Sequence, residues 1–262
     1  MSVHIESAGR GAPLVLLHGW AMHGGLWQSV LPRLIGRFRV HNVDLPGHGW
    51  SPGVTPYTLE ALVEAVASAV AALPDLRHVP VTVLGWSLGG LIALEWARTR
   101  PVGVRALVLT ATTPCFVQRD DWPHAMAAAT LDRFDDELVA SYRLTLQRFL
   151  SLQMQGSERS REALAQMRST LFARGEPTPA DLRDALAVLA TTDLRRVVAD
   201  IAQSALIIVG DRDALTPLAA SRWLAAALPK ATLVTLAGAG HAPFISHPDA
   251  FVAALDRFAD EH

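Results

Sequence analysis

A serine flanked by glycines is the feature of this sequence whose chemistry is easiest to define. The letters GWSLG at residues 85–89 form a G-x-S-x-G pattern between an apolar run at residues 81–84 and a helix-forming stretch that begins at Leu88. Glycines on both sides allow a sharp strand-to-helix turn that raises the serine hydroxyl above a sheet. The helix N-terminus behind the serine favours developing negative charge. The pattern therefore predicts that Ser87 is a nucleophile.

A serine hydroxyl is a weak nucleophile that needs a base, and the base needs a third group to orient it. Among ten histidines, His241 alone combines the chain order Ser, acid, His with a loop position directly after an apolar run. Two acids, Asp211 and Asp213, follow the apolar run at residues 205–209. We favour Asp213 as the third group. Spacing alone leaves both acids open, and Asp211 could instead form the turn beside Gly210.

An oxyanion hole is the remaining part that acyl transfer requires. We expect one backbone N–H from Leu88, the residue after the serine, and one from Trp20, in the turn His18-Gly19-Trp20 after an earlier apolar run. His18 is expected to shape this turn. The side chain of Trp20 either walls an acyl pocket or belongs to the core. This chemistry uses no metal and no organic cofactor, so we expect none.

Alternating apolar runs and helical stretches must position these groups. Continuous apolar runs, which are typical of parallel strands covered on both faces, occur at residues 14–17, 40–43, 81–84, 106–110, 205–209 and 232–236. Helical spacing occupies residues 59–72, 88–100 and 248–259. This alternation predicts an α/β fold, with a mostly parallel central sheet flanked by helices.

The strand pattern is interrupted between residues 116 and 199. This segment holds only amphipathic helical stretches, at residues 136–153, 159–172 and 179–190. We therefore divide the chain into an α/β core, residues 1–115 and 200–262, and an inserted helical cap, residues 116–199. An insertion at the carboxyl end of a strand would lie over the site, where open α/β sheets bind ligands.

The composition argues against several kinds of partner. Half of the 262 residues are hydrophobic and the formal net charge is -2, so there is no general attraction to nucleic acid or to a membrane surface. One cysteine, Cys115, excludes an intrachain disulfide and fits a reducing compartment. The N-terminal stretch has neither the basic region nor the long apolar region of a secretory signal. We expect a soluble, cytoplasmic monomer.

Five sequence motifs, spread along the whole chain, point to one family. LLHGW, VDLPGHG, GWSLGG, GDRDALTP and GHAPFISHP resemble the motifs of the α/β-hydrolase superfamily. Aligned on them, the acid falls on Asp213. The resemblance implies the α/β-hydrolase fold and a serine hydrolase with the triad Ser87, Asp213 and His241.

More particular segments narrow the resemblance to one group of esterases. GWSLGGL, TPCFVQRDDWP, RFLSLQ and HAPFISHP are similar to segments of the pimeloyl-[acyl-carrier protein] methyl ester esterases of biotin synthesis. This resemblance implies cleavage of the methyl ester from a pimeloyl chain that is tethered to acyl carrier protein. It also implies that Trp20, Leu88 and Phe149 line the acyl tunnel.

The same resemblance implies how the carrier protein is held. Acyl carrier protein is acidic, and the family binds it through basic residues on the cap helices. The matching positions here are Arg148, Arg161 and Arg168. Two other positions that are basic in the family are Leu144 and Ala165 in this chain. From the residues alone, arginines on exposed helices are more simply read as a solvated face.

Other functions share the general motifs. A broad carboxylesterase, or a hydrolase of carbon–carbon bonds, would use the same triad on free small molecules. A non-catalytic ligand-binding protein is disfavoured because serine, histidine and acid are all present. A dehalogenase would carry an aspartate at position 87, where this chain has Ser87.

Overall fold

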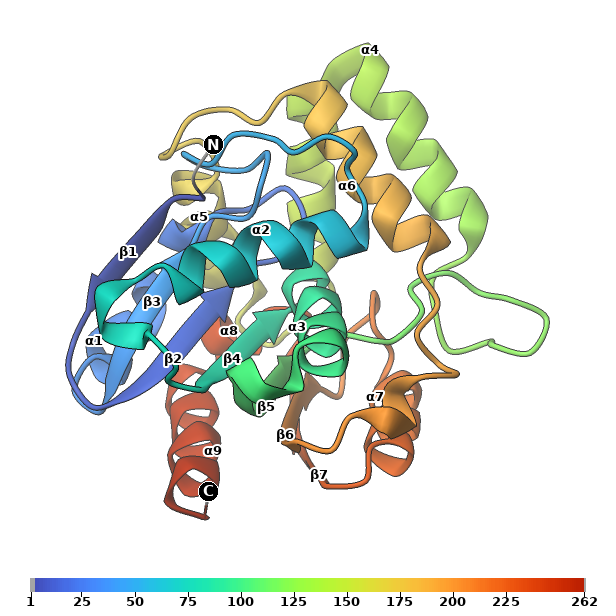
Figure 1. Ribbon diagram of the computed structural model, residues 1–262. Coiled ribbons are helices and arrows are strands. Elements are labelled where there is room, and N and C mark those ends of the chain that lie inside the picture. The colour runs from blue at the N-terminus through green and yellow to red at the C-terminus, as the bar shows by residue number, and fades with distance from the viewer. Residues whose placement is uncertain (1–2, 262) are drawn as a thin grey trace.

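Continuous apolar runs become the central strands of the computed structural model, which describes residues 3–261 (Figure 1). Six strands follow these runs: β2 (Ala12–Leu17), β3 (Phe38–Val43), β4 (Val81–Trp86), β5 (Val104–Thr110), β6 (Ser204–Gly210) and β7 (Ala231–Leu236). Most side chains of β2 to β6 are buried whichever face they point to, which is why polar residues do not alternate along them. The predicted α/β class is confirmed.

The strands form one sheet of seven, in the order β1-β3-β2-β4-β5-β6-β7. The additional strand β1 (Ile5–Ala8) lies at one edge and pairs antiparallel to β3, whereas all other pairs are parallel. Because β2, β4, β6 and β7 run in the same direction, the loops that follow them emerge at the same edge of the sheet. The predicted site residues of the core stand on these loops.

Helices of the core cover the sheet. They are α1 (Leu31–Leu34), α2 (Leu59–Ala71), α3 (Leu88–Thr99), α7 (Leu218–Ala227), α8 (Pro243–Ser246) and α9 (Pro248–Glu261). Helix α3 packs on β4 and β5, α2 packs on α3, and α9 packs on β6 and β7. Within residues 3–261, no helix has the length and apolar character needed to cross a bilayer.

Three helices stand in the segment between β5 and β6. They are α4 (Ala128–Gln153), α5 (Ser160–Thr170) and α6 (Pro179–Thr191), and α4 packs lengthwise against α6 beyond one end of the sheet (Figure 1). Helix α4 is interrupted at Ser141, whose φ of -163° and ψ of 69° are not helical. We propose that this segment is the cap, so that the boundaries of core and cap remain those drawn from the sequence.

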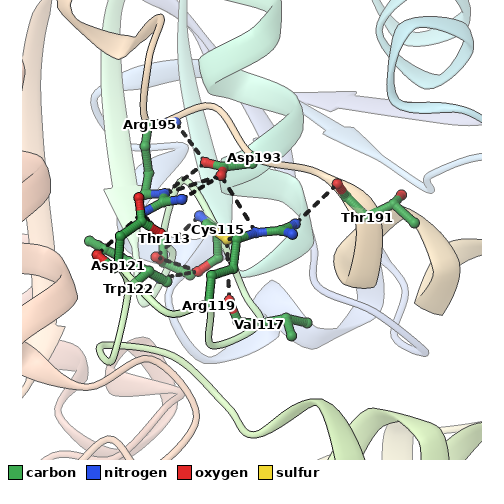
Figure 2. A network of polar contacts seen from close by, with 9 residues as sticks. All are labelled: Thr113, Cys115, Val117, Arg119, Asp121, Trp122, Thr191, Asp193 and Arg195. Atoms are coloured by element: carbon green, nitrogen blue, oxygen red, sulfur yellow. Dashed lines mark hydrogen bonds and ion pairs between the residues drawn. The ribbon is translucent and has the colours of Figure 1, made fainter.

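Two ion pairs join the chain segment that enters the cap to the segment that leaves it (Figure 2). Arg119 Nε on the entering segment lies 3.5 Å from Asp193 Oδ2, and Arg195 Nη1 on the leaving segment lies 3.0 Å from Asp121 Oδ1. The Arg195 guanidinium also stacks over the ring of Trp122, 5.3 Å from its centroid. Trp122 in turn meets Trp223 of α7 edge to face, with centroids 5.1 Å apart, so both connections of the cap are held together at one place on the core.

The single cysteine lies inside this network. Cys115 is fully buried, and its Sγ donates to the carbonyl of Val117 at 3.3 Å and accepts from Arg119 Nε at 3.4 Å. A buried thiol with both of these contacts is shielded from reagents in solvent, so its role here is packing.

A buried ion pair joins the cap to the core at a second place. Arg174, in the loop after α5, places Nη1 3.2 Å from the buried carboxylate of Asp44, and it also pairs with Glu6. Its guanidinium lies over the ring of Trp50, 4.8 Å from the centroid. Asp44 in turn accepts from the backbone N–H of Gly24 at 2.7 Å. The cap is thereby connected to the loop that follows β2.

Candidate active site

Ser87 stands on a strained turn between β4 and α3. Its φ of 55° and ψ of -116° belong to a region that non-glycine residues rarely occupy, at a cost of about 1–3 kcal/mol. The turn is possible because its flanking glycines have no side chain. A Cβ on Gly85 would lie 2.3 Å from the carbonyl oxygen of Gly89, and one on Gly89 would lie 2.3 Å from that of Leu17. The pattern seen in the sequence is thus a steric requirement.

His241 and Asp213, the expected base and acid, meet in the structure. His241 Nδ1 lies 2.9 Å from Asp213 Oδ2, and both side chains are buried. The backbone of His241 is held on both sides: its N–H donates to the carbonyl of Gln153 at 3.1 Å, and its carbonyl accepts from the Trp86 indole at 2.8 Å. Because Nδ1 faces the acid, Nε2 is the nitrogen available to the serine.

Among the residues described, no hydrogen bond joins the hydroxyl of Ser87, the candidate nucleophile, to His241, the candidate base. Such contacts are often long in the absence of substrate and shorten when it binds. Ser87 and His241 follow β4 and β7, which end at the same edge of the sheet, so both lie at the site.

The two acids that the sequence left open have different surroundings. Asp211 is exposed, and its Oδ1 accepts from the backbone N–H of Gly238 at 2.8 Å, which joins the loops after β6 and β7. Asp213 is buried and is the acid that contacts His241. The Thr216 hydroxyl also donates to Asp213 Oδ2, at 2.5 Å, a contact that sequence reasoning missed. Within residues 3–261, no group of three or more His, Cys, Asp or Glu side chains is placed to hold a metal ion.

The two backbone groups expected in the oxyanion hole are close to Ser87. Leu88 is the first residue of α3, where backbone N–H groups have no partner within the helix. Trp20 follows Gly19, and a Cβ on Gly19 would lie 3.2 Å from Ser87 Cβ and 3.0 Å from the Trp86 ring. Only glycine lets this turn approach the nucleophile so closely. This close approach is what an oxyanion hole made of these two backbone N–H groups would require.

His18 holds the orientation of that turn. Its Nε2 accepts from the backbone N–H of Leu45 at 2.9 Å, so the ring is neutral and its Nδ1–H donates to the carbonyl of Gly19 at 2.8 Å. This carbonyl shares a planar peptide unit with the N–H of Trp20. Burial, assisted by the nearby charge of His48, lowers the pKa of His18 to about 3. The imidazole therefore stays neutral throughout the range in which esterases work.

Stability should fall in mild acid because of His18. The pKa of His18 is about 3 in the folded protein, against 6.5 as its ordinary value, so between these values only the unfolded chain binds the proton. Its contribution is complete above pH 6.5 and is lost as the pH falls toward 3. Between pH 7 and pH 5 the free energy of unfolding should drop by about 2 kcal/mol from this group alone.

Urea unfolding at pH 7 and pH 5 measures this loss. His18→Asn should show a smaller difference between the two pH values than the wild type. The matched control is His78→Asn on the surface, where φ is 62° and asparagine is tolerated. This control should keep the wild-type difference. If all three proteins lost the same free energy, His18 would not be the neutral buried group described here.

Aromatic side chains from core and cap pack together beside the oxyanion turn. Trp20 and Phe149 meet edge to face with centroids 4.7 Å apart, and Phe149 meets Phe134 in the same way at 5.5 Å. The Trp20 indole donates to the carbonyl of Leu182 on α6 at 2.9 Å. Leu88, the residue after Ser87, is fully buried. Phe134 was missed in the sequence because the predicted helix began at residue 136, whereas α4 begins at Ala128.

The three cap arginines surround one groove. Arg148 and Arg161 line a groove of ≈ 510 Å³ between α4 and α5, and Arg168 contacts Ser151 on its wall at 3.4 Å. Arg148 is paired with Glu137 at 3.1 Å, so part of its charge is compensated. Within residues 3–261, Arg161 and Arg168 have no carboxylate partner. Their positive charge is thus available to a ligand or partner at this groove.

Residues 14–254 of this chain match the alpha/beta hydrolase family. A pimeloyl-[acyl-carrier protein] methyl ester esterase of Nitrosomonas europaea is 45% identical over 255 residues, which are 97% of this chain and 98% of that protein. One of Xanthomonas campestris is 46% identical over 257 residues, 98% of each chain.

Solved structures give the same architecture at lower identity. An esterase from Exiguobacterium antarcticum has a TM-score of 0.86 at 23% identity and covers 98% of this chain and 95% of its own. An enol-lactonase from Burkholderia xenovorans has a TM-score of 0.84 at 22% identity, with 98% and 96% covered. At these identities the likeness concerns the fold alone.

Proposed function

This chain belongs to the alpha/beta hydrolase family and, within it, to the pimeloyl-[acyl-carrier protein] methyl ester esterases, and on this basis we propose the reaction that it catalyses. It hydrolyses pimeloyl-[acyl-carrier protein] methyl ester to pimeloyl-[acyl-carrier protein] and methanol, a step in biotin synthesis. The working form is a cytoplasmic monomer whose partner is the acyl carrier protein.

One observation carries the proposal. The identity of 45% to 46% to esterases of this name extends over nearly the full length of both chains and therefore includes the cap. The enzymes that share the fold at 22% to 23% identity carry other names. Phe149 of the cap packs edge to face on Trp20 in the oxyanion turn, so similarity in the cap bears on the substrate and not only on the chemistry.

The mechanism is acyl transfer in two steps. His241 Nε2 takes the proton of Ser87 while the hydroxyl oxygen attacks the carbonyl carbon of the methyl ester. The backbone N–H groups of Leu88 and Trp20 hold the tetrahedral oxyanion, and Asp213 stabilises the imidazolium. His241 then returns the proton to the leaving methoxide, which departs as methanol. Water attacks the acyl-enzyme with His241 again as base, which releases the carboxylate and restores Ser87.

The proposal is tested with two methyl esters of the same pimeloyl chain, one bound to the carrier as a thioester and the other free, with a second methyl ester in place of that thioester. The value of kcat/KM is measured for pimeloyl-[acyl-carrier protein] methyl ester and for free dimethyl pimelate at equal low concentrations. We expect a strong preference for the ester on the carrier. Equal or faster turnover of the free diester would leave the triad unaffected and reduce the protein to a general carboxylesterase.

Reversing the unpaired cap charges should weaken recognition of the carrier. In the double variant Arg161→Glu/Arg168→Glu, kcat/KM for the ester on the carrier should fall by about 10- to 100-fold, because an acidic partner would now be repelled. Turnover of dimethyl pimelate should change less than about twofold. The preference of the wild type should also decrease as salt is added.

A control with the same change in net charge is available on the core. Arg222 on α7 and Arg257 on α9 are exposed and lie outside the cap. The variant Arg222→Glu/Arg257→Glu should retain the wild-type kcat/KM for the ester on the carrier. Equal losses in both double variants would point to a general effect of charge and would contradict docking at the cap groove.

A further inference from the structure

Thr216 is a buried residue beside the triad, and it has no role in the proposed mechanism. It belongs to the turn Asp213-Ala214-Leu215-Thr216 after β6, and its side chain is fully buried. The hydroxyl oxygen lies 2.5 Å from Asp213 Oδ2 and 3.4 Å from His241 Nδ1. It therefore stands beside the hydrogen bond between acid and base.

The turn supplies three of the four donors to this carboxylate. Asp213 Oδ1 accepts from the backbone N–H groups of Leu215 at 2.8 Å and Thr216 at 2.9 Å. Oδ2 accepts from the Thr216 hydroxyl and faces His241 Nδ1. Without the hydroxyl, the two backbone donors would still hold Oδ1, but only the imidazole would hold Oδ2, so the tilt of the carboxylate toward His241 would be less well fixed.

From this geometry we infer that Thr216 is a positioning residue of the triad that fixes the orientation of Asp213 and, through it, of the His241 imidazole. The inference rests on the proposed triad. A hydroxyl that donates to a carboxylate forms a charge-assisted hydrogen bond, which is stronger than a bond between two neutral groups. With Oδ2 held by this bond, Nδ1 of His241 meets the acid in the orientation that leaves Nε2 free to take the proton of Ser87.

Other charges near this loop do not compete with Thr216 for the acid. Asp211, Arg212 and Glu158 are all exposed, so their influence is screened by solvent. Asp211 is bonded to the backbone of Gly238, and Arg212 pairs with Glu158 at 3.3 Å. The element of the cap that meets His241 contributes an uncharged residue, Gln153.

Thr216→Val tests the inference because valine keeps the shape of threonine and removes the hydroxyl. With a p-nitrophenyl ester as probe, kcat should fall about 10- to 100-fold, as expected for loss of a hydrogen bond to a charged group, while KM changes little. Thr216→Ser, which keeps the hydroxyl, should restore the wild-type kcat.

A purely structural role would give a different result. Thr216→Val would then have a lower Tm, but its kcat per folded enzyme would match the wild type, and this outcome would overturn the inference. If valine prevents folding, Thr216→Ala provides the same comparison. Labelling with a fluorophosphonate separates the two proposals. Absence of an adduct on Ser87 of the wild type would count against the proposed function, whereas an unchanged labelling rate in Thr216→Val would count against Thr216 alone.

Discussion

Ser87→Ala should lower kcat for ester hydrolysis by about 10⁴-fold or more, the largest effect expected of any single substitution in this chain. Removal of the hydroxyl removes the atom that forms the acyl-enzyme, so only the slow direct attack of water remains. The fold should be retained, since alanine keeps the Cβ and the turn depends on the glycines around it. Steady-state hydrolysis of a p-nitrophenyl ester, with circular dichroism to check folding, measures the effect.

A second buried serine provides the control. Ser221 on α7 is fully buried, and its hydroxyl has no hydrogen-bond partner within residues 3–261. Ser221→Ala should therefore keep the wild-type kcat. Activity near the wild-type level in Ser87→Ala would refute the assignment of the nucleophile, whatever the control shows.

Asp213→Asn should give the second largest loss, about 10³- to 10⁴-fold in kcat. The amide oxygen of the new side chain can take the two backbone donors of Leu215 and Thr216, which leaves its NH₂ facing His241 Nδ1. Two donors then oppose each other, and the imidazole adopts the wrong tautomer or turns away. The hydrolysis rate at the optimum pH measures the loss.

Asp211→Asn is the matched comparison, because it makes the same chemical change two residues earlier in the same loop. Asparagine can still accept from the Gly238 N–H, so kcat should stay within about threefold of the wild type. The reverse order, with the larger loss in Asp211→Asn, would mean that the acid of the triad was assigned incorrectly.

Much of the fold could be predicted from the sequence because burial on both faces produces continuous apolar runs. Every run between Leu14 and Leu236 that was read as a strand is a strand. The edge strand β1 was missed because it is short and only partly buried. Helix α7 was missed because alanines at half of the positions of LAASRWLAAA hide its periodicity. Helix α4 begins at Ala128, eight residues before the predicted start at 136, and its interruption at Ser141 has no signal in the sequence.

The candidate site, like the fold, could be predicted only in part. Ser87 and His241 could be proposed from local patterns, since a strand, a turn and a helix define where a nucleophile would stand. The choice between Asp211 and Asp213 depends on which partner each meets on the loop after β7, and spacing contains no information on that contact. Thr216 could not have been found, because one hydroxyl pointing at a carboxylate has no sequence signature.

The most direct test of the central claim is the intact mass of pimeloyl-[acyl-carrier protein] methyl ester after incubation with the wild type and with Ser87→Ala. We predict that the wild type lowers the mass of the carrier by one methylene, the difference between methyl ester and acid, and that Ser87→Ala leaves the mass unchanged. Loss of the whole pimeloyl group, which would mean cleavage of the thioester, or an unchanged carrier with the wild type would contradict the account.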